Sequence, residues 1–427
     1  SLIVQLCLLP LLVYYFHRVP VASVLLNLWV GIVIALESFA AIIGVLISRF
    51  SDVLAVPFLQ ATQFLNWLLV RVPALLIDIA AASSRVPVYT SWMKSIYLAY
   101  LLPLVLLAFV LTYWDPFALK RSGHSLRLFL SASAATVLLA GFIAFHPYSS
   151  PLPNGRLTVE FLDVGQGDSA FVTFPNGQTM LVDGGGRISY SDPDEDTFEP
   201  DVPRIGEAVV SEFLWERGYS RVDYIVATHA DTDHIQGLAD VAKNFEIGTA
   251  LLGRTPADDP ELNELLDVLD RQSIETVSVS AGDRIDISGV RVDVLHPEPA
   301  DLDALSDNNS SIVFRLTFGG RSFVLTGDVE SDGEKELLQT PELLRADVVK
   351  VPHHGSRTSS TDGFIDAVGA EYAVVSVGRG SIFGHPHPEV VDRWKSAGAQ
   401  VLITGRTGMI TVSTDGKDLV VKELFPE

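Results

Sequence analysis

The stretch Thr228-His229-Ala230-Asp231-Thr232-Asp233-His234 gathers four side chains that can bind a metal ion within six residues. It follows Val222–Ala227, a mainly apolar run typical of a buried strand. Imidazoles and carboxylates crowded at a strand end are costly to remove from water, and a pair of divalent cations is the simplest compensation. An Asp that caps the start of a helix is the alternative explanation. The stretch predicts a metal-dependent hydrolase with its centre at strand ends.

The spacing within this stretch divides the ligands between two metal ions. His229 and Asp231 project to one side of an extended tip, because alternate residues of an extended chain face the same way. Asp233 and His234 then bend toward an adjacent position. We therefore expect two ligands for each metal, and we also expect a catalytic role for Asp233.

Further metal-binding side chains stand at other predicted strand ends. Asp328 follows an apolar run and Gly327, a residue that lets the backbone pass close to an ion, so Asp328 suits a carboxylate bridging two metals. His353 and His354 follow another apolar run; we expect His354 to be a ligand and His353 to be a general acid. His385 is a catalytic candidate, as a metal ligand or as a contact to the reacting group of the substrate.

Weaker candidates surround these residues. Turn acids that hold the metal ligands in place are expected at Asp163, Asp168 and Asp183. Groups at the rim that contact the substrate are expected at Asn308, Asn309, Ser311, Ser356 and Arg357. For the Asn-Asn-Ser-Ser run a plain turn leading into a strand is an equal alternative.

Residues 157–427 alternate short strands with helices, which is the pattern of an α/β fold. Strands are predicted at 157–162, 170–174, 179–182, 225–228, 290–295, 311–317, 322–325, 346–351 and 373–377. Helices are predicted at 205–217, 261–271 and 334–338. Polar tips at strand ends are where such folds gather their chemistry.

The first third of the chain has a different composition. Residues 1–150 carry eight Lys or Arg against four Asp or Glu, whereas the whole chain has a net charge of −22. Spans of about 20 apolar residues indicate membrane helices. Such spans are predicted at 21–47, 96–114 and 126–145, with a shorter one at 2–16. Residues 50–89 carry scattered Arg, Asp, Asn and Pro and are predicted to be interfacial instead.

These patterns divide the chain into a membrane region at 1–148, a Pro/Ser/Gly linker at 149–156 and an acidic domain at 157–427. The loop before the last span carries Lys120, Arg121 and Arg127, which places that loop in the cytoplasm. The acidic domain is therefore expected on the periplasmic or outer side. Because Ser1 opens the chain inside an apolar run, we expect it to be the C-terminal part of a longer membrane protein.

In this order, the motifs resemble the metallo-β-lactamase superfamily. The resemblance implies a four-layer αβ/βα sandwich with two metals at one end of its sheets. The family's His-x-His-x-Asp-His motif stands here as His-x-Asp-x-Asp-His, with Asp231 in place of a histidine. The usual next histidine is not evident, and Asn308 and Asn309 stand in that region. The first metal is then expected on His229, Asp231 and Asp328.

A narrower resemblance comes from the combination of motifs. These are Asp163-Val-Gly-Gln-Gly-Asp168, Leu181-Val-Asp-Gly-Gly185, Asn308-Asn-Ser-Ser311, Leu325-Thr-Gly-Asp328, His353-His-Gly-Ser356 and Gly384-His-Pro386. Behind a polytopic membrane region they look like the ComEC-type DNA-uptake channels of competent bacteria. That resemblance implies a multi-pass protein of the bacterial cytoplasmic membrane that passes one DNA strand inward. It also implies an external nuclease that degrades the other strand, and partners that include a DNA receptor and an ATP-driven cytoplasmic protein.

Composition leaves other functions open. A carboxylate-rich ligand set favours Mn²⁺, with Zn²⁺ and Mg²⁺ as alternatives. The strongly acidic domain is unusual for a nucleic-acid binder, although Arg187, Arg357 and Arg379 lie near the motifs. The alternatives are a membrane-anchored metallo-hydrolase of another phosphodiester or ester, and a channel subunit with a catalytically inactive domain.

Overall fold

The structure is a computed structural model that describes residues 2–77, 84–112, 123–147, 150–187, 204–256, 259–299 and 305–426. The chain forms two compact units. The first comprises Ser1–Ser150 together with Trp215–Gly218, and the second comprises Pro151–Leu214 together with Tyr219–Glu427.

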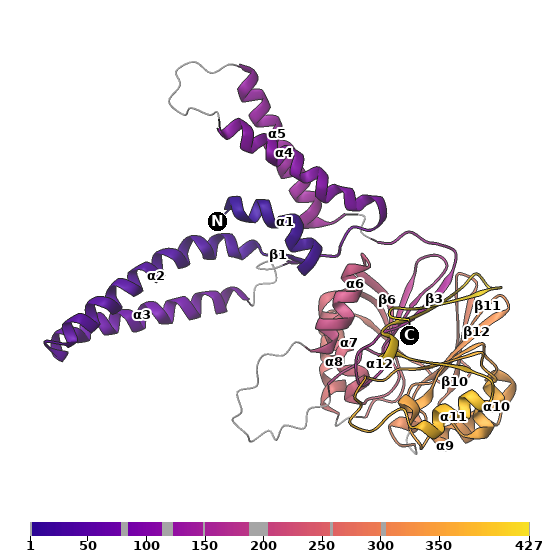
Figure 1. Ribbon diagram of the computed structural model, residues 1–427. Coiled ribbons are helices and arrows are strands. Elements are labelled where there is room, and N and C mark those ends of the chain that lie inside the picture. The colour runs from indigo at the N-terminus through magenta and orange to yellow at the C-terminus, as the bar shows by residue number, and fades with distance from the viewer. Residues whose placement is uncertain are drawn as a thin grey trace. The chain divides into compact units, whose positions relative to one another are not determined.

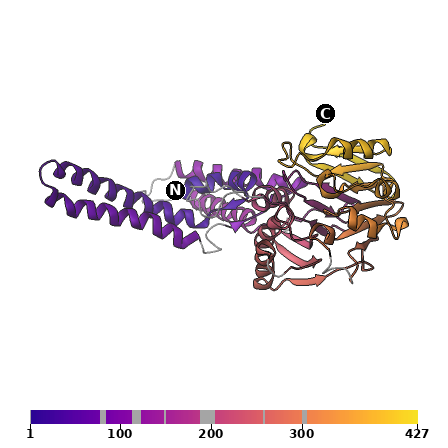
Figure 2. The ribbon, with the colours of Figure 1, turned by 90° about the horizontal axis from the view of Figure 1, so that it is seen from below.

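The first unit is helical. Its helices α2 and α3 lie side by side, and so do α4 and α5 (Figures 1 and 2). A short antiparallel pair, β1 (Arg18–Val19) with β2 (Ser84–Arg85), joins segments far apart in the sequence. The helices are α1 (Leu2–Phe16), α2 (Val21–Ser48), α3 (Asp52–Ile77), η2 (Ser91–Lys94), α4 (Ser95–Thr112) and α5 (Gly123–Phe145).

Long apolar helices in this unit are sufficient to cross a membrane by length and composition. The spans are Trp29–Ser48, Asp52–Leu75, Ser91–Thr112 and Leu126–Phe145, and Ile3–Phe16 is shorter. Helix α3 lies within the stretch 50–89 that was predicted to be interfacial, and it is instead long and apolar enough to span a membrane. Its charged residues are Asp52 and Arg71, so the 18 residues between them carry no Asp, Glu, Lys or Arg.

The basic loop used to predict orientation lies mostly outside the described residues. Lys120 and Arg121 fall in the range 113–122, whose placement is not described. The side on which the second unit stands consequently remains a prediction from the sequence.

The second unit contains two β-sheets. An eight-stranded sheet has the order β17-β16-β3-β4-β5-β6-β7-β8, and a seven-stranded sheet has the order β15-β14-β13-β12-β11-β10-β9. The strands of the eight-stranded sheet are β3 (Leu157–Phe161), β4 (Ala170–Thr173), β5 (Thr179–Val182), β6 (Arg221–Ala227), β7 (Glu246–Leu252), β8 (Glu275–Ser278), β16 (Ile410–Thr414) and β17 (Leu419–Glu423). Those of the other sheet are β9 (Arg284–Ile287), β10 (Val290–His296), β11 (Val313–Phe318), β12 (Arg321–Leu325), β13 (Val348–Lys350), β14 (Tyr372–Val375) and β15 (Gln400–Ile403).

The main hydrophobic core lies between the two sheets. Phe161 of one sheet and Phe323 of the other are fully buried in the same cluster. The alternation of buried and half-buried residues along β10 points Val290, Val292 and Val294 into it, as expected for a strand with one core-facing side.

Helices cover the outer faces of the sheets, which makes a four-layer αβ/βα sandwich (Figure 1). Figure 1 shows α6, α7 and α8 beside one sheet and α9, α10 and α11 beside the other. The helical segments are η3 (Gly206–Ser211), α6 (Glu212–Glu216), α7 (Thr232–Asn244), α8 (Pro260–Arg271), η4 (Asn308–Ser310), α9 (Ser331–Leu337), η5 (Pro341–Leu343), η6 (Pro352–Gly355), α10 (Asp362–Val368), α11 (Pro388–Ser396) and α12 (Thr404–Thr407).

Parallel pairing brings the polar strand ends together. Strands β5 to β8 pair in parallel, and β12 to β15 do the same in the other sheet. The carboxyl ends of parallel strands meet at one edge, so the residues after β5, β6, β12 and β13 gather there.

The stretch 229–234 differs from the predicted extended tip, because α7 begins at Thr232 and puts Asp233 and His234 in a helical turn.

The first turns of α7 sit directly on the loop after β5. Gly184 N–H donates to the His234 carbonyl at 2.7 Å, and Gly237 N–H donates to the Gly185 carbonyl at 2.9 Å. A Cβ on Gly237 would lie 2.0 Å from the Gly184 carbonyl oxygen. The backbones approach this closely because both positions are glycine.

Gly237→Ala should therefore destabilise the second unit by about 1–3 kcal/mol, the usual range for overpacking a close contact. The measurement is urea unfolding of the detergent-solubilised chain. Gly380→Ala is the matched control, because a Cβ at Gly380 would meet nothing within 4 Å. Equal stability of the two variants would contradict the packing argument.

Candidate metal centre

His234 is fully buried at the start of α7 with its ring held from behind. Its Nδ1 lies 2.9 Å from Asp183 Oδ2. That contact makes Nδ1 the protonated nitrogen, since a carboxylate accepts hydrogen bonds. The other nitrogen, Nε2, then presents a lone pair and lies 3.3 Å from Asp328 Oδ2.

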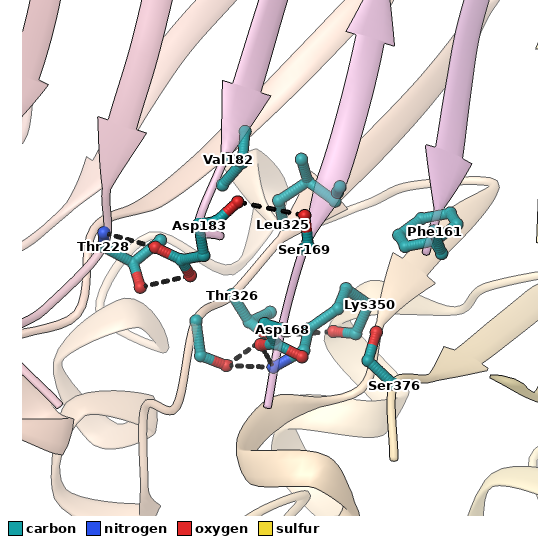
Figure 3. A pocket seen from close by; sticks show the side chains of 12 residues that line it. Phe161, Asp168, Ser169, Val182, Asp183, Thr228, Leu325, Thr326, Lys350 and Ser376 are labelled. Atoms are coloured by element: carbon teal, nitrogen blue, oxygen red, sulfur yellow. Dashed lines mark hydrogen bonds and ion pairs between the residues drawn. The ribbon is translucent and has the colours of Figure 1, made fainter. Parts of the chain in front are cut away.

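His229, at the end of β6, is oriented through Thr228. The Thr228 hydroxyl donates to Asp183 Oδ2 at 2.7 Å, and the Thr228 backbone N–H donates to Asp183 Oδ1 at 2.9 Å. The same hydroxyl lies 3.1 Å from His229 Nδ1, which donates to it. Figure 3 shows Thr228 and Asp183 pointing toward one another. Asp183 thus fixes two imidazoles at once, one directly and one through Thr228.

His353 and His354 come from the loop after β13. Both have positive φ angles, 48° and 53°, an uncommon conformation for residues with side chains. Buried His354 directs Nδ1 at the Ser376 carbonyl, 2.9 Å away, and Nε2 at Asp328 Oδ2, 3.1 Å away. Half-buried His353 places Nδ1 3.2 Å from Glu330 Oε1. The turn therefore aims two imidazoles into the same space.

Asp328 stands where these imidazoles converge. Its Oδ2 faces the Nε2 atoms of His234, His354 and, at 3.8 Å, His353. The Asp328 backbone N–H donates to the Ser311 hydroxyl at 3.0 Å, which fixes the start of the turn. Burial alone would raise the pKa of Asp328, but the charges of His354 and His234 hold it well below its usual value.

Asp231 and Asp233 add two further carboxylates beside the imidazoles of His229 and His354. Buried Asp233 places Oδ2 3.5 Å from His354 Nε2. Burial alone would raise its pKa, but the neighbouring imidazoles of His354 and His234 lower it. Asp231 is partly exposed and lies 3.5 Å from His229 Nε2. The neighbouring imidazole of His229 lowers the pKa of Asp231, so both carboxylates are ionised at neutral pH.

The arrangement fits divalent metal ions. The Nε2 atoms of His229, His234 and His354 are buried and make no hydrogen bond to any residue that the structure describes. Buried nitrogens without partners are costly unless a ligand satisfies them. Ligand atoms lie within 4.8 Å of one another in the sets His229–His234–Asp328, Asp233–His234–His354, Asp168–Asp328–His354 and Asp168–Asp183–His234.

One charged residue of this centre, Lys350, was not among the residues predicted from the sequence. Lys350 ends β13, and its ammonium contacts Asp168, Asp328 Oδ1 at 3.1 Å and the Gly327 carbonyl at 2.7 Å. Its signal was weak, since a Lys after Val348-Val349 resembles an ordinary strand-end charge. Asp168, expected to support the site, is brought into it through this lysine and lies 3.4 Å from His354 Nδ1.

Two further predicted residues are His385, which lies beside His353, and Asp163, which lies in an exposed turn. His385 is half-buried with its ring centre 5.6 Å from that of His353. Burial and the charges of His354 and His353 lower its pKa to about 4, so His385 is neutral at pH 7. Asp163 is exposed and accepts from the Gly165 N–H at 3.3 Å, which caps a turn and orients no imidazole.

The predicted substrate contacts are placed differently from the expectation. The Asn309 side-chain oxygen accepts from the N–H groups of Glu330 and Gly333 at the start of α9, so this amide is occupied within the fold. Ser311 holds the Asp328 backbone, and the Ser356 hydroxyl lies 3.0 Å from that of Thr358. The exposed residue Arg357 pairs with Glu389, and Asn308 is half-buried in η4.

This geometry agrees with comparison against known families. Residues 162–379 match the family model described as the metallo-beta-lactamase superfamily, which is just over half of the chain. The chain belongs to the metallo-beta-lactamase superfamily. Residues 1–146 match the model described as competence protein. The predicted fold, a metallo-β-lactamase sandwich after a helical membrane region, is confirmed.

Curated relatives share both regions. The ComE operon protein 3 of Bacillus subtilis is 30% identical over 416 residues, covering 96% of this chain and 50% of that protein. Competence protein ComA of Neisseria gonorrhoeae is 29% identical over 277 residues, covering 65% of this chain and 35% of that protein. The resemblance to ComEC-type proteins is thus confirmed, and the chain spans about half, or less, of the length of these relatives.

Solved structures of this superfamily are more distant. The metallo-beta-lactamase fold protein YhfI from Bacillus subtilis aligns with a TM-score of 0.37 and 13% identity, covering 58% of this chain and 96% of that one.

Asp183→Asn should weaken Mn²⁺ binding by about 10–100-fold, the usual cost of losing a group that orients metal ligands. The reason is that Asp183 fixes both His234 and, through Thr228, His229. Equilibrium dialysis of the purified chain with Mn²⁺ measures the effect. Asp163→Asn, a change of the same type at an exposed turn, is the control and should bind as the parent does; a loss as large as that of Asp183→Asn would sink the assignment.

Proposed function

We propose that the second unit is a metal-dependent nuclease within a membrane protein of DNA uptake. The observation that carries the proposal is the convergence of three buried imidazoles on one carboxylate, Asp328, with Asp231 and Asp233 completing an oxygen-rich set. Two divalent cations bound there supply Lewis acids and an activated water, the means by which many enzymes hydrolyse phosphodiesters. The relatives named for competence support DNA as the substrate.

Ligand chemistry favours Mn²⁺ over Zn²⁺. We assign His229, Asp231, Asp233, His234, Asp328 and His354 as the ligands. Carboxylate and imidazole together suit Mn²⁺, while Zn²⁺ prefers sites richer in nitrogen and sulfur. Asp231, where the superfamily motif has a histidine, adds oxygen to the set and strengthens this preference.

The imidazole of His353 is suited to move a proton during the reaction. Its Nδ1 faces Glu330, and the Thr358 hydroxyl donates to the same Glu330 oxygen at 2.6 Å. A carboxylate at Nδ1 keeps that nitrogen protonated and leaves Nε2 directed at the centre, 3.8 Å from Asp328 Oδ2. Neutral His385 lies beside it and is suited to donate a hydrogen bond to a substrate oxygen.

The acidic character of the chain requires that DNA be delivered to this unit. The net charge of −22 opposes binding of a polyanion at a distance. Exposed Arg379 and Arg357 lie on loops that adjoin the centre and offer positive charge locally, although Arg357 pairs with Glu389. We propose that a membrane channel, a DNA receptor and an ATP-driven cytoplasmic partner bring the strand past the site.

Hydrolysis of another ester is the competing function, because the superfamily fold by itself does not fix the substrate. The two candidates differ in what they cleave and not in the groups that cleave it. The purified chain with Mn²⁺ should degrade single- or double-stranded DNA, and bis(4-nitrophenyl) phosphate as a small phosphodiester.

Asp328→Ala and His354→Ala should each reduce DNA cleavage by at least about a hundredfold, since each removes a ligand of the divalent cations that would stabilise the charge of the transition state. Rates are measured on end-labelled DNA by gel electrophoresis. The control is Asp332→Ala, whose side chain is exposed and pairs with Lys335 at the surface. Cleavage of a carboxylic ester but of neither DNA nor the small phosphodiester would refute the nuclease and favour the competing function.

We place the second unit on the outer face of the cytoplasmic membrane. A single cysteine at exposed Gln272, in a chain whose Cys7 is replaced by Ser, should react with a membrane-impermeant maleimide in intact spheroplasts. The same variant in lysed cells gives the full extent of labelling. Labelling that appears only after lysis would put the unit in the cytoplasm and overturn the topology.

A further inference from the structure

Lys350 is a cation built into the centre. Its side chain is 5% exposed and leaves β13 toward the ends of both sheets. The ammonium has three hydrogens and meets three acceptors: a carboxylate oxygen of Asp168, Oδ1 of Asp328 and the Gly327 carbonyl. With its hydrogens taken up in this way, the amine is not placed to act as a base or a nucleophile.

The contacts of Lys350 span both sheets. Asp168 precedes β4 in the eight-stranded sheet, whereas Lys350 ends β13 and Asp328 follows β12 in the seven-stranded sheet. Figure 3 shows Lys350 and Asp168 reaching toward one another among the residues that line a small cavity. Figure 3 also places Ser376 and Thr326 beside the pair, and the Thr326 hydroxyl donates to the Lys350 carbonyl at 2.9 Å.

The acceptors around this ammonium are those that a hard divalent cation takes. Carboxylate and carbonyl oxygens are the preferred ligands of Mn²⁺, Mg²⁺ and Ca²⁺. Asp168 and Asp328 also belong, with His354, to one of the sets whose ligand atoms lie within 4.8 Å of one another. The protein has therefore filled with its own ammonium a position that offers the donors of a metal site.

The charges of the centre explain why a monovalent cation suits this position. The four buried carboxylates, Asp168, Asp183, Asp233 and Asp328, are joined by partly exposed Asp231. Five negative charges are neutralised when one ammonium and two divalent cations are present, with the histidines neutral. While the ammonium is in place a third divalent cation is excluded, because two cations would have to share the contacts to Asp168 and Asp328.

Because of Lys350, the two carboxylate oxygens of Asp328 have different partners. Oδ1 faces the ammonium, and Oδ2 faces the Nε2 atoms of His234 and His354. One oxygen is thereby kept for the imidazole side of the centre, where the metal ligands converge.

We propose that the Lys350 ammonium occupies a third cation position of the centre and so limits it to two divalent ions. The inference rests on the proposed metal centre and is independent of which substrate is cleaved. Removing the ammonium without filling its space opens the position to a divalent ion on Asp168, Asp328 and the Gly327 carbonyl.

The test counts ions in the purified full chain. The parent, equilibrated with Mn²⁺ by dialysis, should hold two tightly bound ions per chain, and Lys350→Ala should hold three. The double variant Lys350→Ala/Asp168→Asn is the matched control: it keeps the vacated space but removes one of the two carboxylates, so the count should return to two. Near-UV circular dichroism shows that each variant is folded, and Lys350→Ser replaces Lys350→Ala if the latter is not.

The outcomes separate this inference from the function it builds on. A folded Lys350→Ala or Lys350→Ser chain that holds two ions or fewer would overturn the role of Lys350, since the position would then be filled by a proton or by rearrangement. Three ions in the double variant would overturn it as well, because the additional ion would not be bound by Asp168. A parent that binds no Mn²⁺ would overturn the metal centre itself, and a parent that binds two ions without cleaving DNA would overturn only the nuclease.

Discussion

The carboxylate of Asp328 contacts His234, His354 and Lys350 where the two sheets meet. The arrangement of these side chains depends on it. It meets the imidazoles of His234 and His354 on one oxygen and the ammonium of Lys350 on the other. Each of those groups is buried, and buried charge is tolerated only beside opposite charge. Removing the carboxylate would leave three cationic or metal-binding groups facing one another.

The ligands stay in place because the backbone behind them is packed too closely to move. Helix α7 rests on the Gly184–Gly186 turn with backbone hydrogen bonds in both directions, and Asp183 immediately before that turn orients the imidazoles of α7 and of β6. Positions that must be glycine for close backbone packing therefore lie next to Asp183, which orients the candidate metal ligands. This explains why the run Asp183-Gly-Gly-Gly186 lies beside the centre.

The metal-binding stretch could be recognised from the sequence because its members are close together along the chain. Four candidate ligands, two His and two Asp, within six residues are rare by chance, and the strand before them indicates their place in the fold. The roles of Asp168 and Lys350 could not be recognised in this way. They are separated by 181 intervening residues in the numbering, and each is an ordinary turn or strand-end residue until the two sheets come together. For Asn309 the structure supports the alternative of a structural turn, because its side-chain oxygen accepts from two N–H groups at the start of α9.

The sequence by itself predicted the alternation of strands and helices, the helical membrane region and a cluster of candidate metal ligands at 229–234, because hydrophobic periodicity and clustered ligands are local properties of the chain. The αβ/βα sandwich was predicted from the resemblance of its motifs to a known superfamily. The tertiary structure alone decided which imidazole nitrogen faces the centre, which oxygen of Asp328 each cation meets, and that a lysine stands among the carboxylates. Those choices depend on distances between residues on different strands, and no local pattern encodes them. Helix α3 is a further example. Its charged and polar residues interrupt the apolar pattern in the sequence, yet the helix is continuous from Asp52 to Ile77.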